Sequence, residues 1–419
     1  QSWKLMCICA SIFPPSDEFA NYLACYLYQQ TKEAGNVGEA ATFALKALDR
    51  TMEATQRRVQ PMPDEIKRIE VRGPISIKVQ FLDNSHRTLL VTSQTRASQV
   101  QKAMADTYRM KHPESFGLFE CEQPRPGWDK DIYEKRDKME REQKINDLQN
   151  MPMDRELEMS ERIMDVVSSW KRSKKKKDRK VAFVYKCKLF SKAQETSYSR
   201  QEWKVAFVTA AWHVLHGLYP LSEEHAFQLA AIQLQANHGL KDDNFYITGV
   251  MNAEVENYIP YTYLRKYRPE EAESKVLKLH TAHKHLDKPD AYRKYLELLR
   301  KEASPQYFGN CFFRAVRVSR LKKTKSQEQD DLVLGISENG VIFVDPYNNK
   351  IMEKYKMEEI LTYGFRSNAF LFVAGTLMTQ KKYQFATMLG KQINDLLRAH
   401  IDLRVQQAEI QGYQINTQV

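Results

Sequence analysis

The spacing of apolar residues predicts three helices in the first 60 residues. The first is an apolar stretch that ends at Pro14 and Pro15, and Ser16 then begins a second helix as its N-cap. In this second helix the apolar side chains at helical spacing are Phe19, Tyr22, Leu23, Tyr26 and Leu27. A third helix runs from about Val37, and Pro61 and Pro63 mark a boundary after it. Residues 1–60 are therefore predicted to form an all-helical domain.

A change of period at Pro74 predicts a β-rich domain over residues 72–190. Residues 75–81 alternate between apolar and polar side chains, which is the pattern of a half-buried strand. After it we expect a turn at 83–85, a strand at 88–92, a helix capped by Thr95 or Ser98, a strand at 114–121 and a closing strand at 181–190. This order is that of a small β-grasp domain. The segment at about 124–158 is rich in charge, and we interpret it as an inserted loop with some helix.

The rest of the chain is predicted to form a helical block and then a second β-rich domain. Within the block, residues 195–302, Ser222 caps a helix that Gly239 ends. Later, Asn339-Gly340 joins two apolar runs, which is a strong hairpin signal. Further strands are expected at 350–356, 360–366, 368–374 and 381–386, before a last helix that buries Leu389, Ile393, Leu396, Leu397 and Ile401. Residues 307–403 are thus predicted to be pleckstrin-homology-like, with a C-terminal tail at 404–419.

Composition narrows the class of protein. The 419 residues contain no uninterrupted apolar run of about 18, so we predict no membrane-spanning helix. The six cysteines are dispersed, mostly among apolar neighbours, which is typical of reduced thiols in a cytosolic protein. A net charge of +11 favours acidic partners. The chain opens on Gln1 inside a predicted helix and shows no signal-peptide pattern, so we expect a fragment of a longer intracellular polypeptide.

The sequence offers no motif for catalysis or for a cofactor. It has no Gly-rich phosphate loop, no Gly-x-Ser-x-Gly and no His-Glu-x-x-His. His280, His283 and His285 lack a cysteine or carboxylate that would complete a metal site, and we interpret them as an exposed helical turn. We therefore predict an intracellular binding module that is not an enzyme and that holds no cofactor or metal. Any motor ATPase would lie outside this chain.

Several local sequences resemble known families. Residues 222–239 (SEEHAFQLAAIQLQANHG), 307–313 (YFGNCFF) and 332–346 (LVLGISENGVIFVDP) are similar to motifs of the FERM domain, and residues 2–27 resemble the latter part of a MyTH4 domain. The resemblance implies an α+β multi-domain fold with a helical MyTH4 fragment and a three-lobed FERM domain. Its lobes would be a ubiquitin-like β-grasp, an acyl-CoA-binding-protein-like helical bundle and a pleckstrin-homology/phosphotyrosine-binding-like lobe. The first half of MyTH4 is missing, and the charged insertion matches nothing specific in the family.

MyTH4 followed directly by FERM is the tail arrangement of unconventional myosins and of some plant and algal kinesins. This chain most resembles the tails of class-seven, ten and fifteen myosins. That resemblance implies a tail that docks membrane-protein tails, adaptor peptides, microtubules or actin to a motor and that folds back on the parent motor domain. It implies a cytoplasmic, cytoskeleton-associated protein, at the plasma membrane or in actin-rich protrusions. The alternatives are a phosphoinositide-binding membrane–cytoskeleton linker without a motor, and a FERM-bearing phosphatase or kinase whose catalytic domain lies elsewhere.

A basic run is the first candidate binding surface. Its cations are Lys171, Arg172, Lys174, Lys175, Lys176, Lys177, Arg179 and Lys180. They could bind anionic phospholipid, at about 1 kcal/mol per residue near a membrane, contact an acidic protein surface, or form a solvated loop. Nucleic acid is not expected, because no aromatic residues interleave with the charges. A second group of lysines, at 322–325, lies beside acidic residues and is interpreted as a plain loop.

The second candidate is a peptide groove in the last β-rich lobe. In lobes of the phosphotyrosine-binding type, an extended peptide pairs with a strand edge, and its side chains enter a crevice beside the C-terminal helix. The edge here would be Thr362, Tyr363, Gly364, Phe365 and Arg366. The helical side would offer Met388, Lys391, Gln392 and Asp395. The other interpretation is that Phe365 and Met388 belong to the ordinary core.

Overall fold

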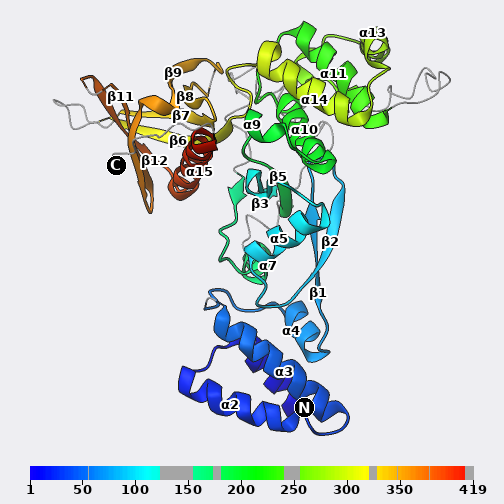
Figure 1. The fold of residues 1–419 in the computed structure, drawn as a ribbon, viewed down its shortest axis with the longest axis vertical. Helices are drawn as coiled ribbons and strands as arrows, with labels where there is room; N and C mark the ends of the chain where they lie inside the picture. The colour runs from blue at the N-terminus through cyan, green and yellow to red at the C-terminus, as the bar shows by residue number, and fades with distance from the viewer. Residues whose placement is uncertain are drawn as a thin grey trace.

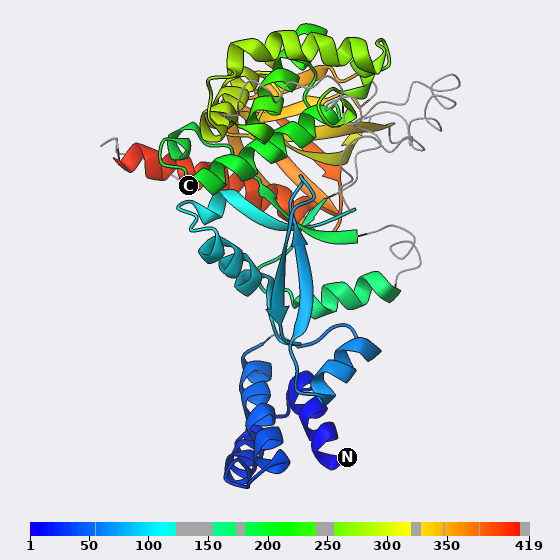
Figure 2. The same cartoon turned by 90° about the vertical axis from the view of Figure 1, so that its right-hand side faces the viewer.

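The computed structural model describes residues 1–54, 56–122, 154–172, 181–239, 255–319, 328–346, 348–376 and 378–410. Figures 1 and 2 show an elongated molecule with the N-terminal helices at one end and a small β lobe next to them. A helical lobe and a second β lobe lie together at the other end. The predicted α+β multi-domain plan is confirmed. Among the residues described, no helix is both long and apolar enough to cross a membrane.

The N-terminal lobe consists of α1 (Ser2–Ile12), α2 (Asp17–Gln30), α3 (Asn36–Glu53) and α4 (Pro63–Glu70). Ser16 caps α2 as predicted, accepting a hydrogen bond from the Phe19 backbone N–H at 3.4 Å. Of the apolar positions predicted for α2, only Leu27 is fully buried, while Phe19, Tyr22 and Tyr26 are between 47% and 69% exposed. Pro63 begins α4 instead of a loop, because proline fits the first turn of a helix.

The first β lobe is a five-stranded sheet in the order β2-β1-β5-β3-β4 among the residues described. Its elements are β1 (Ile75–Gln80), β2 (His86–Val91), α5 (Ala97–Thr107), β3 (Phe116–Glu122), β4 (Arg155–Glu156), α7 (Ile163–Arg172) and β5 (Val181–Cys187). The predicted cap of α5 was wrong: its N-cap is Arg96, whose backbone N–H donates to the Gln99 side-chain oxygen at 2.9 Å. The segment interpreted as an insertion also ends earlier than expected, because β4 pairs with β3.

The helical lobe contains α9 (Lys192–Glu195), α10 (Arg200–Leu215), α11 (Glu223–His238), α12 (Tyr261–Leu264), α13 (Pro269–His280) and α14 (Lys288–Leu298). Ser222 and Gly239 bound α11 as predicted, with the Ser222 hydroxyl accepting from the His225 N–H at 3.2 Å and Gly239 at φ +73°. The apolar core of this lobe is continuous with that of both β lobes, from Val79 through Phe207 to Val333. The three lobes therefore pack as one body.

The last lobe is a seven-stranded sheet, in the order β10-β11-β12-β6-β7-β8-β9, covered by one long helix. Its elements are β6 (Cys311–Ser319), β7 (Glu328–Ser337), β8 (Gly340–Val344), β9 (Ile351–Tyr355), β10 (Ile360–Arg366), β11 (Ala369–Gly375), β12 (Gln380–Ala386) and α15 (Gly390–Ile410). The predicted Asn-Gly hairpin joins β7 to β8. Gly340 adopts φ +126°, and a Cβ there would lie 1.9 Å from the Tyr355 carbonyl oxygen, so this position requires glycine.

Candidate binding site

The predicted peptide groove corresponds to the edge strand β10 and the first half of α15. Strand β10 lies at one end of the described sheet and pairs only with β11 there. Tyr363 and Phe365 stand opposite Phe372 and Phe370, which are both buried. Because cross-strand partners share a face of a sheet, Tyr363 and Phe365 face the side that α15 covers. A Cβ placed on Gly390 would lie 3.2 Å from the Phe365 Cβ, so α15 begins directly against Phe365.

Apolar side chains along this edge remain partly open to solvent. Leu361 is 37% exposed, Phe365 44% and Met388 78%. Phe365 and Met388 are therefore not ordinary core residues, which was the other interpretation of the sequence. On the opposite face of β10, Gly364 has open space where a side chain would stand. The edge thus combines a strand with one open side and partly exposed apolar side chains.

On the helical side, two of the predicted residues contact the segment around β4 of the first β lobe: Lys391 lies 3.3 Å from Glu158, and Gln392 bonds to Glu156. Gln392 donates its side-chain amide to the Glu156 carbonyl at 3.0 Å, so it holds α15 against the first β lobe and does not line the groove. Lys391 and Asp395 lie 3.3 Å apart on the outer stripe of α15. The same stripe continues through Arg398 and Asp402 at helical spacing.

Arg398 and Asp402 lie beside the candidate site, and sequence reasoning missed them. Burial raises the pKa of the Tyr363 phenol, the Asp402 carboxylate raises it further, and the Arg398 guanidinium opposes both. Both charges therefore lie close to Tyr363. The sequence did contain a signal for them. Arg398 follows Lys391 by seven residues and Asp402 follows Asp395 by seven, and residues seven apart lie on the same face of a helix. The groove is thus an apolar strand edge bordered by a charged helical stripe.

Only the start of the predicted basic surface lies within the described residues. Lys171 forms an ion pair with Asp64 at 2.8 Å, and Arg172 donates to the Gln60 side-chain and backbone oxygens at 3.2 Å. Lys171 and Arg172 thus contact the N-terminal lobe. The other cations fall outside the described residues: Lys174, Lys175, Lys176, Lys177, Arg179 and Lys180. The lysine group at 322–325 lies wholly outside them as well.

Of the three histidines predicted to form an exposed turn, His285 is exposed and His283 is half-buried, but His280 is buried. His280 is 4% exposed, and its Nε2 lies 2.8 Å from the Gln235 side-chain oxygen. Burial lowers the pKa of His280 to about 4. Within the described ranges, no group of three His, Cys, Asp or Glu side chains is placed to hold a metal ion.

A buried ionic network joins the N-terminal lobe to the first β lobe. Arg57 makes two hydrogen bonds to the Glu65 carboxylate, at 2.5 and 2.7 Å, and both side chains are almost fully buried. Arg57 also lies 3.2 Å from Asp165 of α7, which accepts a further hydrogen bond from the Arg58 N–H. A second link runs through Gln94, whose amide donates to Ser11 and Thr51 at 2.5 and 3.0 Å. These contacts fix the N-terminal helices on the lobe that follows them.

The helix α15 carries a buried histidine that couples the stability of the last lobe to pH. His400 is 2% exposed, and its Nε2 has no hydrogen-bond partner among the described residues. Burial, aided by Arg404 and Lys188, lowers the pKa of His400 to about 4. The unfolded chain, with a histidine pKa near 6.5, therefore binds more protons than the folded chain between pH 6.5 and 4. Stability falls as the pH is lowered through this window.

We expect His400→Leu to reduce this pH dependence. The single histidine accounts for a loss of about 2 kcal/mol in the free energy of unfolding at pH 5 relative to pH 7. The variant should not lose this free energy between pH 7 and pH 5. At pH 7 it should fold stably, because leucine is apolar and the Nε2 atom that it replaces makes no hydrogen bond. Urea unfolding at pH 7 and pH 5, followed by circular dichroism, measures both quantities. Equal losses in variant and wild type would show that His400 does not titrate as described.

Four family models match successive parts of the chain. The MyTH4 domain matches residues 1–68, the RA like domain 73–139, the FERM central domain 194–313 and the PTB domain (IRS-1 type) 316–405. Kinesin-like protein KIN-14E of Arabidopsis thaliana is 26% identical over 96% of this chain. The chain spans 31% of the length of that relative.

Two solved structures share the fold over nearly the whole chain. The MyTH4-FERM MF1 domain of Dictyostelium discoideum myosin VII superposes with a TM-score of 0.68, at 17% identity, covering 96% of this chain and 75% of that one. The human myosin 7b C-terminal MyTH4-FERM domain, solved in complex with the harmonin-a PDZ3 domain, gives a TM-score of 0.65 at 17% identity and covers 96% and 74%. Family models and fold agree along the chain, from the N-terminal helices to α15. The chain therefore has the domain order and the fold of a MyTH4-FERM module.

Proposed function

We propose that this module is the cargo- and cytoskeleton-binding tail of a motor protein, and that extended peptides dock in the groove of β10 and α15. The open apolar edge of β10 carries the proposal. An added strand would gain backbone hydrogen bonds from β10, and its side chains would meet Leu361 and Phe365. Its charged side chains would meet the Lys391–Asp402 stripe of α15, where both signs are present.

A motor is the better-supported parent protein for two reasons. The kinesin-like relative aligns over nearly all of this chain, and the two solved neighbours are myosin tail domains. Modules of this kind are non-catalytic, so their contribution is to bind. The partners proposed are membrane-protein tails or adaptor peptides, with microtubules, actin and the parent motor domain as further partners. This would place the protein in the cytoplasm, at the cytoskeleton. The membrane–cytoskeleton linker remains the alternative, with phosphoinositide at the basic run.

The groove is tested by a matched pair of substitutions in the whole chain. Phe365→Asp puts a charge into the groove, while Met352→Asp puts the same charge at a residue of β9 with nearly equal exposure, 44% against 45%. We expect the wild type and Met352→Asp to retain the same membrane-protein tails in a pull-down read by mass spectrometry. Phe365→Asp should lose them about tenfold or more, because a buried carboxylate without a partner is costly. Equal retention by both variants would exclude the groove.

The linker alternative makes a different prediction under salt. If the basic run at 171–180 docks on anionic lipid, binding to phosphatidylserine vesicles should fall steeply when the salt concentration rises from about 0.05 to about 0.3 M. Reversing the charges of the run should abolish that binding, whereas peptide retention by the groove should change little. Vesicle binding that survives charge reversal would exclude the run as a lipid site.

A further inference from the structure

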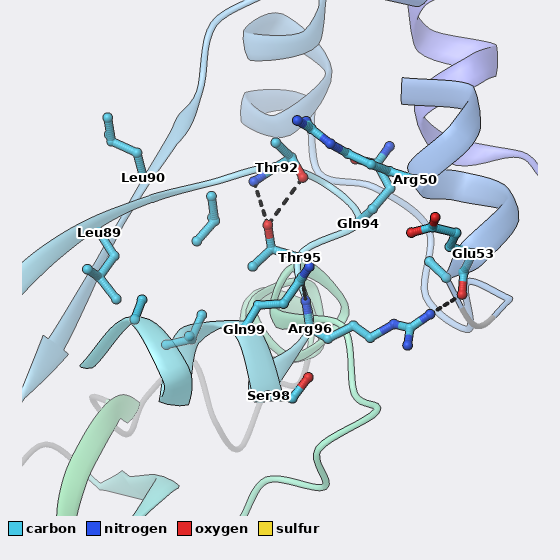
Figure 3. A pocket seen from close by; sticks show the side chains of 14 residues that line it. Arg50, Glu53, Leu89, Leu90, Thr92, Gln94, Thr95, Arg96, Ser98 and Gln99 are labelled. Carbon is cyan, nitrogen blue, oxygen red and sulfur yellow. Dashed lines mark hydrogen bonds between the residues drawn. The ribbon is translucent and has the colours of Figure 1, made fainter. Parts of the chain in front are cut away.

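A cavity lies between the N-terminal lobe and the first β lobe (Figure 3), and none of the residues that line it belongs to β10 or α15. It has a volume of about 510 Å³. Its walls come from the end of α3, the strand β2 and the first turns of α5. Two domains therefore build one cavity, and the buried network of Arg57 and Glu65 beside it fixes their relative position.

One wall of the cavity is the outer side of an edge strand. Among the described residues, β2 pairs only with β1, so its other side has no partner strand. Exposed edge strands in soluble proteins are commonly protected by charged side chains or by proline. Here the end of β2 that lines the cavity carries Leu89 and Leu90 instead, and Leu90 is 70% exposed. Leu89 lies on the face of the sheet that α5 covers, beside Val100 and Ala103, while Leu90 lies on the opposite face.

The other end of the cavity is positively charged. Figure 3 shows the guanidinium of Arg50 reaching from α3 toward Thr92, and Arg96 reaching from the start of α5 toward the end of α3. Arg96 donates a hydrogen bond to the Glu53 carbonyl. The Arg50 carbonyl accepts a hydrogen bond from the Ala54 N–H, but its guanidinium forms no hydrogen bond or ion pair within the part of the chain that the structure describes. The charged residues that line the cavity are Arg50, Arg96 and Glu53, so two positive charges are opposed by one negative charge.

We propose that this cavity binds a second extended peptide, one that carries an acidic group beside an aliphatic or aromatic side chain. The peptide adds as a strand to the open edge of β2, which supplies backbone hydrogen bonds. Its apolar side chains alternate between the two faces of the sheet, packing on Leu90 on one face and on Leu89 and α5 on the other, and its carboxylate pairs with Arg50. This charge complementarity selects an acidic peptide over a basic one. The site is separate from the groove of β10 and α15 and does not depend on it.

Peptide selection on the whole chain tests this site without a known ligand. Twelve-residue peptides displayed on phage are selected on the Phe365→Asp variant, so that the groove of β10 and α15 does not contribute. We expect the selected peptides to share an acidic residue near an apolar one. Hydrogen exchange on the complex should show protection of the β2 amides at residues 86–91. Selected peptides without an acid, or protection that leaves out β2, would overturn the proposal.

Two matched pairs of variants then assign the contacts. Arg50→Glu should weaken the selected peptides about tenfold or more, while Arg68→Glu, the same charge change on exposed α4, should leave the affinity within about twofold. Leu90→Ser should weaken them several-fold, whereas Val71→Ser, at 66% exposure, should not. All four residues are exposed, so these variants keep the fold. Loss with Arg50→Glu alone would mean attraction by charge without strand addition, and this would also contradict the proposal.

Discussion

Replacing Glu65 with alanine should lower the free energy of unfolding of the N-terminal lobe by about 3–5 kcal/mol. The change leaves the guanidinium of Arg57, which is 6% exposed, without its bidentate partner in a buried site. Asp165 would remain 3.2 Å away but offers only one contact at that distance. Because the same residues join two lobes, the variant should also let the N-terminal helices exchange amide hydrogens independently of the rest. Urea unfolding with hydrogen exchange read by mass spectrometry measures both effects.

The control is a surface ion pair at the same junction. Asp64 and Lys171 lie 2.8 Å apart but are 75% and 47% exposed, so Asp64→Ala should cost less than about 1 kcal/mol. The joint change Arg57→Met with Glu65→Leu removes both charges and should recover most of the stability, since no unpaired ion remains. A Glu65→Ala variant as stable as Asp64→Ala would show that the network does not hold the junction together.

Phe343→Ala should lower the free energy of unfolding of the last lobe by about 3–5 kcal/mol. The Phe343 ring is fully buried and packs against four other rings, at centroid distances of 5.0 to 6.0 Å. Deleting it leaves a cavity that neighbouring rings cannot fill without leaving their own contacts. The lobe holds no tryptophan, so hydrogen exchange in β8 and α15 is the suitable measurement.

This substitution should also remove peptide binding at the groove, because β10 and α15 pack on the same core. Met378→Ala is the matched control in the same lobe, since Met378 is 97% exposed and its loss should cost less than about 0.5 kcal/mol. If Phe343→Ala exchanged faster in β8 but still bound peptide, binding at β10 and α15 would not depend on the packing around Phe343, contrary to this prediction.

Local chemistry made much of the fold predictable from the sequence. Alternation of apolar residues placed β1, and the Asn-Gly pair placed the hairpin of β7 and β8. Ser222 and Gly239 marked both ends of α11 because a cap and a left-handed C-cap each require particular residues. Each of these signals comes from residues close together in the sequence, so a single sequence is enough to detect it.

What the sequence could not show depends on contacts between distant segments. The strand β4 has only two residues, and it forms because β3 is there to pair with it. The role of Gln392 depends on Glu156, 236 residues away. His280 is buried because Gln235 and α11 cover it, and no local pattern separates it from an exposed histidine. The cavity beside β2 needs residues from two domains, so neither segment alone indicates it.

The central claim is that β10 and α15 form the docking groove of a tail module. The most direct measurement is hydrogen exchange on the whole chain, with and without a membrane-protein tail peptide recovered in the pull-down. We expect new protection at residues 360–366 of β10 and along the Lys391–Asp402 stripe, and none of it in Phe365→Asp. A bound tail peptide that leaves both segments unprotected, or that protects them equally in Phe365→Asp, would contradict the account.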